Sequence, residues 1–493
     1  MRDLLTNPCW SEADLGEPLP DSAHAVSVAM PRWQDVIGYE EENPAVLEKL
    51  RCGYPRFFLP PLLQQLFVSV RQRFGRAGEE CIAFPSPEAA ARCLDFIGRR
   101  TQESARIEPV GPFGLTAVFF PESIRRTARL YWRFSGETVN TRQALCLLEN
   151  RTPDIVAGQT AKQTIRKRLA HLAGTSPADV FLFPSGMAAV FAVHRMLREA
   201  IPGKRSVQLD FPYVDVLKVQ EEFGEGTLFH PTPNAGALAE IRQLARTGEA
   251  CGVFCEIPSN PLLRSARLSE FIADLQQNGV PFILDDTVAT VVNIDALSVA
   301  DAAITSLTKS FSGNGDVLAG AVTLNPKSPR YAEFQRFLTR EFASNDIFWP
   351  EDAVALEINS RDFPKRVRRT SQNAAALAGF LRSHPSVAEV YYPGKGDGLD
   401  EILRPSADRG CLLSFVLNNA AAAPAVFDQL RICKGPSLGT NYTLACPYTL
   451  LVHYQELDWA ERCGVPRHLI RVSVGLEETE DLLARFTDAL HHA

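Results

Sequence analysis

The stretch from about residue 160 to about residue 310 alternates short apolar segments with longer amphipathic ones, and this alternation limits the possible folds. The short segments have the composition of buried strands, and the longer ones have the spacing of helices. Such alternation indicates a parallel α/β sheet with right-handed crossovers. We expect strands at 180–183, 206–209, 252–254, 282–285 and 302–305, and helices at 161–173, 186–200, 214–223, 237–247 and 268–277.

The patterns before and after this region differ, which predicts three units. Residues 1–125 include a Pro-rich segment, 53–61, that suits an extended, packed conformation, and we expect a packing or oligomer-interface role for this unit. Residues 126–345 form the α/β domain, which has a loop at 130–136 near its start. Residues 346–493 mix helices with strands and predict a smaller α+β domain. Its strands are expected near 387–392, 411–416, 448–452 and 469–474, with helices at 353–380, 422–430 and 478–490.

Composition limits the classes of protein to which the chain can belong. Its 58 acidic and 51 basic residues give a net charge of −7 without long runs, which offers no reason to bind nucleic acid or an anionic membrane. No apolar run suits a transmembrane helix, and no signal peptide is evident. Eleven scattered cysteines without a Cys-x-x-Cys pair argue against disulfides and zinc. We therefore expect a cytoplasmic protein that binds small molecules and no metal.

Two strand ends bring together an acid, two hydroxyls and an amine. Asp285 ends one strand, and Ser306, Thr308 and Lys309 follow the next. In open α/β sheets, ligands collect at the carboxyl ends of strands. Pyridoxal phosphate requires such a set, because a lysine holds its aldehyde as a Schiff base, an acid keeps its ring nitrogen protonated and hydroxyls bind its phosphate. The alternative is a capping aspartate and a solvated loop lysine, which are common near strand ends.

Other strand ends carry further candidates. Ser185, Gly186 and Met187 stand between a strand and a helix, where the free N–H groups and positive dipole end of the helix can bind phosphate. A plain βα turn is the alternative. Tyr213 could lie on a planar ring or simply pack, and Asn260 could face the same site or form an Asx turn.

Two further observations concern the ligand. Arg471 is a lone cation in an apolar strand, so its burial needs an anion from the protein or from a substrate carboxylate. The sequence contains neither a Walker-type phosphate loop nor a Gly-x-Gly-x-x-Gly after a strand, which argues against nucleotide and NAD binding.

The order of these motifs resembles the Cys/Met-metabolism family of pyridoxal-phosphate enzymes, the cystathionine γ-synthase and γ-lyase group, over about residues 128–493. Within the family the chain is similar to the fungal-type synthases, which share an N-terminal extension with Gly-Tyr-Pro-Arg-Phe-Phe. The resemblance implies the type I transferase fold, which is that of aspartate aminotransferase. The matching blocks are Tyr131-x-Arg133, Ser185-Gly-Met-Ala-Ala189, Tyr213, Glu256-x-Pro-Ser-Asn-Pro261, Asp285-x-Thr287, Ser306-x-Thr-Lys309, Ser437-Leu-Gly439 and Ile470-Arg-Val-Ser-Val-Gly-Leu-Glu477.

The resemblance also implies residue roles. Lys309 would bind the cofactor covalently and move protons, Asp285 would hold the proton on the ring nitrogen, and Tyr213 would stack on the ring and take part in catalysis. Ser437 and Arg471 would bind the substrate α-carboxylate. The remaining cofactor-binding residues that the resemblance implies are Ser185, Gly186, Met187, Asn260, Thr287, Ser306 and Thr308.

In this family Tyr131, with a catalytic role, and Arg133 would reach the phosphate of the neighbouring subunit. The resemblance therefore implies a homodimer or homotetramer with shared active sites.

Three departures from the family pattern concern the pocket and the second substrate. Asp286 replaces an asparagine beside the key acid, the loop after Arg133 reads Phe-Ser-Gly-Glu137, and Pro436 stands where many members have a glutamate.

The expected reaction is γ-replacement on an O-acyl-L-homoserine with L-cysteine, giving cystathionine for methionine biosynthesis. The alternatives are a γ-lyase, or γ-replacement with a carbon or amine nucleophile in specialised metabolism. A catalytically silent scaffold is expected to lose Lys309 or Asp285, and the chain keeps both.

Overall fold

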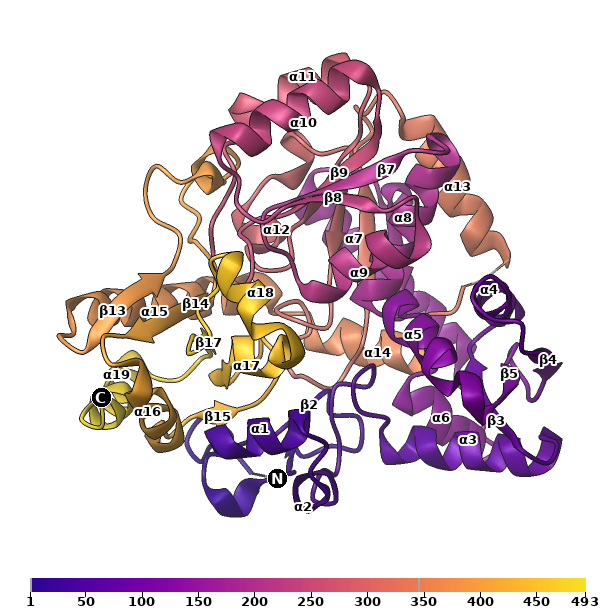
Figure 1. Ribbon diagram of the computed structural model, residues 1–493, viewed down its shortest axis with the longest axis horizontal. Helices are drawn as coiled ribbons and strands as arrows, with labels where there is room; N and C mark the ends of the chain where they lie inside the picture. Colours follow the sequence, from indigo (N-terminus) through magenta and orange to yellow (C-terminus); the bar gives the residue numbers. More distant parts are fainter. Residues whose placement is uncertain (1, 345) are drawn as a thin grey trace.

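The large sheet lies at the centre of the molecule (Figure 1). The computed structural model describes residues 2–344 and 346–493. The strand order is β6-β12-β11-β10-β9-β7-β8, with β12 antiparallel to both of its neighbours and the other pairs parallel, which confirms the mainly parallel α/β fold. The bounds are β6 Val180–Phe183, β7 Arg205–Leu209, β8 Thr227–His230, β9 Ala250–Glu256, β10 Phe282–Asp285, β11 Ala302–Thr305 and β12 Gly320–Leu324.

Helices cover both faces of this sheet, because its strands are apolar on both sides. Phe181 and Phe183 pack with helix α8 (Gly186–Ala200), whereas Val180 and Leu182 pack with α7 on the opposite face. The helices of the two layers are α7 Ile155–Ala173, α8, α9 Val214–Phe223, α10 Ala235–Thr247, α11 Ile272–Gln277 and α13 Tyr331–Ser344. Within residues 2–344 and 346–493, none of the helices combines the length and apolar character that a bilayer crossing requires.

The smaller C-terminal domain is α+β, as predicted. Its sheet has the order β13-β14-β17-β16-β15, and α15 (Phe363–Ser383), α16 (Ala423–Gln429) and α19 (Thr479–Leu490) share its core. The strand bounds are β13 Val387–Tyr391, β14 Leu412–Leu417, β15 Cys433–Lys434, β16 Leu444–Pro447 and β17 Ile470–Ser473.

Two predictions in the C-terminal half are wrong in detail. Residues 448–452 form helix α17 (Tyr448–Val452), and the strand expected there is β16, just before it. The run is mostly apolar, so its periodicity does not separate strand from helix. Pro447 marks the boundary because proline cannot donate to the ladder. The single helix expected at 353–380 is two helices, α14 (Pro350–Asn359) and α15. Helix α14 packs with α7 and so shares a core with the large domain, although it follows the predicted boundary.

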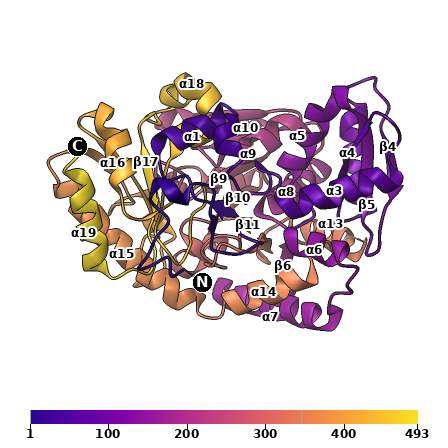
Figure 2. The same cartoon turned by 90° about the horizontal axis from the view of Figure 1, so that it is seen from below.

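The predicted N-terminal unit has two parts that pack on different regions of the molecule (Figures 1 and 2). The first part holds β1 (Pro18–Leu19), β2 (Ser27–Val28), α1 (Trp33–Glu40) and α2 (Pro44–Leu47), and it packs on the small domain. The second part packs on the large domain beside α8. Its elements are α3 Pro61–Phe74, β3 Glu79–Phe84, α4 Pro87–Gly98, β4 Arg106–Pro109 and β5 Thr116–Pro121.

The loop expected at 130–136 is instead the end of helix α5 (Arg125–Ser135), which leads to α6 (Thr141–Leu148). Ala128, Tyr131, Trp132 and Phe134 are buried along this helix, and its high content of arginine and aromatic residues hides the helical spacing. Gly136 ends the helix with φ of 64°, a left-handed conformation that favours glycine.

Candidate active site

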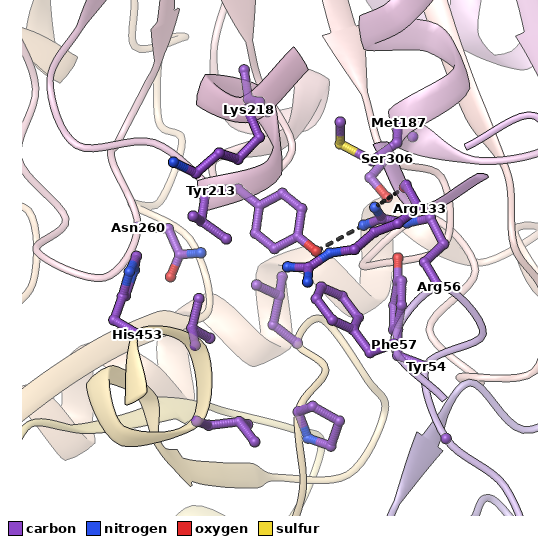
Figure 3. A pocket seen from close by; sticks show the side chains of 18 of the residues that line it. Tyr54, Arg56, Phe57, Arg133, Met187, Tyr213, Lys218, Asn260, Ser306 and His453 are labelled. Atoms are coloured by element: carbon purple, nitrogen blue, oxygen red, sulfur yellow. Dashed lines mark hydrogen bonds between the residues drawn. The ribbon is translucent and has the colours of Figure 1, made fainter. Parts of the chain in front are cut away.

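A cavity of about 360 Å³ lies at the carboxyl ends of β9, β10 and β11, where the large sheet meets the small domain and the N-terminal segment (Figure 3). Lys309 and Asp285 both line it, because β10 and β11 are parallel neighbours whose ends lie side by side. The other predicted residues that line the cavity are Arg133, Gly186, Met187, Tyr213, Asn260, Thr287, Ser306 and Arg471.

The amine of Lys309 has the chemistry of a base. Its Nζ donates a hydrogen bond to Ser437 Oγ at 3.1 Å and lies 4.6 Å from the centre of the Tyr54 ring. Burial, and then the positive charges of Arg471 and Arg56, lower the pKa of Lys309 from 10.5 to about 7. A large fraction of this amine is therefore neutral near neutral pH, and a neutral amine can accept a proton or attack an aldehyde.

The carboxylate of Asp285 lacks a cationic partner among residues 2–344 and 346–493. Its Oδ1 accepts a hydrogen bond from the Thr287 backbone N–H at 3.0 Å, and burial raises the pKa of Asp285. A protonated ring nitrogen would supply the missing charge. Thr287 also joins the two strand ends, because its Oγ1 accepts a hydrogen bond from Ser306 N at 2.8 Å.

The extra acid, Asp286, points away from this cavity. Successive side chains of a strand face opposite sides, and Asp286 lies beneath the sheet, where its carboxylate accepts a 2.5 Å hydrogen bond from Thr305 Oγ1. Burial raises the pKa of Asp286 to about 7. The departure from the family pattern therefore leaves the lining of the cavity unchanged.

The start of helix α8 forms a seat for an anion. The buried Ser185 Oγ accepts a hydrogen bond from Ala188 N at 3.0 Å and donates to Gly136 O at 2.8 Å, so this side chain caps the helix and does not face the cavity. A Cβ on Gly186 would lie 2.8 Å from Ser306 Oγ, and only glycine permits this close approach. The N–H groups at the start of α8 and the Ser306 hydroxyl thus face one space.

Two predicted ligands, Thr308 and Ser437, are buried behind the cavity wall. Thr308 Oγ1 donates to Ala319 O at 3.2 Å and accepts from Ala319 N at 3.0 Å, so it holds the turn that carries Lys309. The Ser437 hydroxyl reaches the cavity through its hydrogen bond with Lys309.

Tyr213 and Arg471 lie on different walls of the cavity. The Tyr213 ring projects into it, and its backbone N–H donates to a Glu256 carboxylate oxygen at 3.0 Å (Figure 3). Arg471 donates to Asn260 Oδ1 at 3.1 Å and to Ser437 O at 3.0 Å. No carboxylate of the described chain forms an ion pair with Arg471, so this cation is free to bind an acid from a ligand.

Sequence reasoning missed two residues of the N-terminal segment, Tyr54 and Arg56, which line the cavity. Arg56 Nη1 lies 2.5 Å from Asp215 Oδ2, and Arg56 Nη2 donates to the Tyr213 hydroxyl at 2.7 Å. From its sequence, the first unit was expected to have no more than a packing or interface role. An arginine between aromatic and proline residues was the available signal, because such a residue needs an anion when it is buried.

Tyr131 and Arg133, the two residues of the Tyr-x-Arg motif, lie in different surroundings in the structure. Arg133 lines the cavity of its own chain, donates to Asp215 Oδ1 at 3.0 Å and stacks 4.4 Å from the centre of the Phe57 ring. Tyr131 is 1% exposed, and its hydroxyl donates to Glu137 Oε2 at 2.7 Å within a cluster of phenylalanines. This placement differs from the expected role at a neighbouring subunit's phosphate, because the phenol is enclosed in its own chain.

The residues of the cavity fit pyridoxal phosphate. Within residues 2–344 and 346–493, Asp285 has no cationic partner, Lys309 has a lowered pKa, and Arg56 lines the same cavity as Gly186 and Met187 at the start of α8. An acid for a ring nitrogen, an amine for an aldehyde and a donor for a phosphate are thus present in one cavity. Fold and site together define a pyridoxal-phosphate-dependent enzyme.

The chain belongs to the family of Cys/Met metabolism PLP-dependent enzymes, which it matches over residues 157–491. Residues 62–140 match the N-terminal domain of fungal trans-sulfuration enzymes. This match covers the region from α3 to α5 and excludes the segment that carries Tyr54 and Arg56.

Similar proteins include a cystathionine gamma-synthase and an enzyme with a different named activity. A cystathionine gamma-synthase of Neurospora crassa is 33% identical, with 97% of this chain and 98% of that protein covered. An L-2-amino-4-chloropent-4-enoate dechlorinase/desaturase of Streptantibioticus cattleyicolor is 30% identical, with 97% and 98% covered. The solved cystathionine gamma synthase of Xanthomonas oryzae shares the fold with a TM-score of 0.58 and 24% identity, over 69% of this chain and 88% of that one.

Proposed function

We propose that this enzyme catalyses γ-replacement on an O-acyl-L-homoserine, with L-cysteine as the nucleophile and cystathionine as the product. The observation that supports this most directly is the position of Ser437, which accepts a hydrogen bond from Lys309 Nζ at 3.1 Å while its carbonyl accepts one from Arg471 at 3.0 Å. A base and a carboxylate-binding cation are therefore neighbours. A substrate whose carboxylate lies on Arg471 has its α-carbon beside the amine.

The protein residues have distinct tasks in this reaction. Bound pyridoxal phosphate supplies an electron sink that acidifies the C–H bonds of an attached amino acid. Lys309 Nζ, when neutral, takes the proton from Cα and later the proton from Cβ. Arg471 and Asn260 fix the α-carboxylate end. The bond from Cγ to the acyl oxygen breaks and the carboxylate leaves. The cysteine thiolate, formed when the thiol gives its proton to solvent, then makes the new bond to Cγ.

A second candidate is a γ-lyase, or a γ-replacement with a carbon or amine nucleophile. It is supported by the apolar residues that the N-terminal segment adds to the cavity wall and by Pro436, which adds no charge where many relatives have a glutamate. The similarity to a dechlorinase/desaturase also favours it, since that relative is described as acting on a chlorinated amino acid. The apolar wall residues are Val28, Met30, Leu50, Phe57 and Phe58.

Product analysis separates these candidates. Purified holoenzyme is given O-acetyl- or O-succinyl-L-homoserine with and without L-cysteine, and the products are identified by mass spectrometry. Cystathionine that forms only with cysteine supports the proposal. Release of 2-oxobutyrate and ammonia irrespective of thiol supports the lyase, and turnover only with an amine or carbon nucleophile supports the other alternative.

A further inference from the structure

A histidine on the wall of the cavity has no task in the reaction described so far. His453 directly follows helix α17, and both it and Glu456, the last residue of the short turn η8 (Tyr454–Glu456), line the cavity. Figure 3 shows the His453 side chain on the same side of the Tyr213 ring as Asn260. Histidine is the side chain that most often transfers protons near neutral pH, so its place in the wall calls for a chemical explanation.

Glu456 fixes the tautomer of His453. The Nδ1 atom of His453 lies 2.9 Å from Glu456 Oε1, and this hydrogen bond lowers the pKa of Glu456. The carboxyl is therefore ionised near neutral pH and can only accept hydrogen bonds. Nδ1 must carry the hydrogen, so in the neutral ring the lone pair lies on Nε2. A histidine held in this way by a carboxylate is oriented as a general base.

The Nε2 atom of His453 is buried and has no hydrogen-bond partner within residues 2–344 and 346–493. Three aromatic rings hold the imidazole in place, with ring centres at 5.3 Å for Phe211, 5.6 Å for Trp459 and 6.0 Å for Tyr448. None of these residues donates a hydrogen bond to Nε2. Buried polar atoms are normally paired, so this free acceptor indicates that a donor of a ligand belongs beside it.

Ring contacts connect His453 to the residues that bind the amino-acid substrate. The guanidinium carbon of Arg471 lies 4.8 Å from the centre of the Tyr448 ring, which also contacts His453, and Arg471 donates to Asn260. In the proposed reaction Lys309 takes the protons of Cα and Cβ. The proton of the incoming thiol therefore needs a different acceptor.

We propose that His453 is the general base for the incoming thiol and that Glu456 positions it; this inference rests on the proposed function. After the acyl carboxylate has left, the S–H bond of cysteine breaks and its proton passes to His453 Nε2. The electron pair left on sulfur forms the new bond to Cγ. The Glu456 carboxylate stabilises the imidazolium, which later releases the proton to solvent and returns to its neutral form.

Competition between two nucleophiles tests this role. The holoenzyme receives an O-acyl-L-homoserine with equal amounts of L-cysteine and L-selenocysteine under reducing conditions, and the ratio of cystathionine to selenocystathionine is measured by mass spectrometry. Selenocysteine has nearly the same shape, but its selenol is ionised near neutral pH and needs no base. The ratio therefore isolates the proton transfer from folding, cofactor binding and the steps before the nucleophile attacks.

His453→Gln should lower this ratio by about 10²-fold relative to the unaltered protein, because loss of a general base slows only the reaction with cysteine. Glu456→Gln keeps the imidazole but loses the charged acceptor that orients it, and should lower the ratio by about 10-fold. Because Glu456 is partly exposed, Glu456→Gln serves as the test if His453→Gln does not fold.

A matched control is His230→Gln. His230 also has a buried Nε2 without a hydrogen-bond partner in the described part of the chain, and this atom lies 3.8 Å from Glu240, but His230 does not line the cavity. Its ratio should equal that of the unaltered protein. Glu40→Gln tests the competing base, because Glu40 lines the cavity and burial raises its pKa to about 7. A ratio that falls in Glu40→Gln and not in His453→Gln would overturn the proposal.

The outcomes for this inference and for the proposed function differ. If the unaltered protein forms both products and the ratio is unchanged in the folded His453 and Glu456 variants, the inference is overturned and the proposed function stands. If the unaltered protein forms neither product, the proposed function fails, and the inference fails with it because the enzyme uses no thiol.

Discussion

The pKa of Lys309 tests the electrostatics of the cavity. Burial and two cations, Arg471 and Arg56, lower it from 10.5 to about 7. At roughly 1.4 kcal/mol per pKa unit, this corresponds to ~5 kcal/mol in favour of the neutral amine. At about pH 7.5, roughly three quarters of such an amine is neutral, against roughly one part in a thousand of an ordinary lysine. The rate of proton transfer should therefore fall as the pH falls through about 7.

Competitive labelling measures this pKa directly. Cofactor-free protein is treated with trace acetic anhydride at a series of pH values, and acetylation of the Lys309 peptide is quantified by mass spectrometry. We expect half-maximal labelling near pH 7, because only the neutral amine reacts. Arg471→Leu removes the larger of the two cationic contributions, so the midpoint should move to higher pH.

The control is Arg168→Leu, which removes a cation outside the cavity and should leave the midpoint unchanged. A midpoint near 10.5 in the unaltered protein, or one that does not rise in Arg471→Leu, would refute the reasoning. Stability gives a check on the sign. Between about pH 7 and 10.5 the unfolded lysine binds a proton that the folded one has released, so this group makes the free energy of unfolding rise with pH in that window.

Three further substitutions test individual roles. Lys309→Ala should abolish the visible absorption band and lower turnover by about 10⁴-fold or more, because the base and the attachment point are lost; a coloured, active variant would contradict the assignment. Asp285→Asn should lower kcat by about 10²–10³-fold, since an amide cannot hold the charge of a protonated ring nitrogen, and an unchanged kcat in single-turnover measurements would contradict this. Ser185→Ala should lower the free energy of unfolding by about 1 kcal/mol in urea denaturation through loss of the α8 cap, and an unchanged midpoint would show that the cap is dispensable.

The site residues that directly follow a buried strand could be predicted from the sequence. Asp285 and Lys309 each follow a recognisable buried strand, and parallel strands place their carboxyl ends at one edge, so their meeting in one cavity needs no knowledge of distant contacts. Gly186 and Ser306 follow the same rule. The strands β6, β7, β9, β10 and β11 were predicted for the same reason. The interior strand β12 was not predicted although it is fully buried, and β8 is only partly buried and carries a weaker apolar signal.

Long-range packing decided the features that the sequence did not reveal. Arg56 meets Asp215 across 159 residues, and no periodicity in either segment indicates this pairing. Tyr131 matches a family motif, yet its surroundings come from Phe84, Phe96 and Phe223, which belong to three other elements. A motif shows that a residue of a given type is present. Whether the side chain of that residue faces the cavity depends on the packing of distant elements.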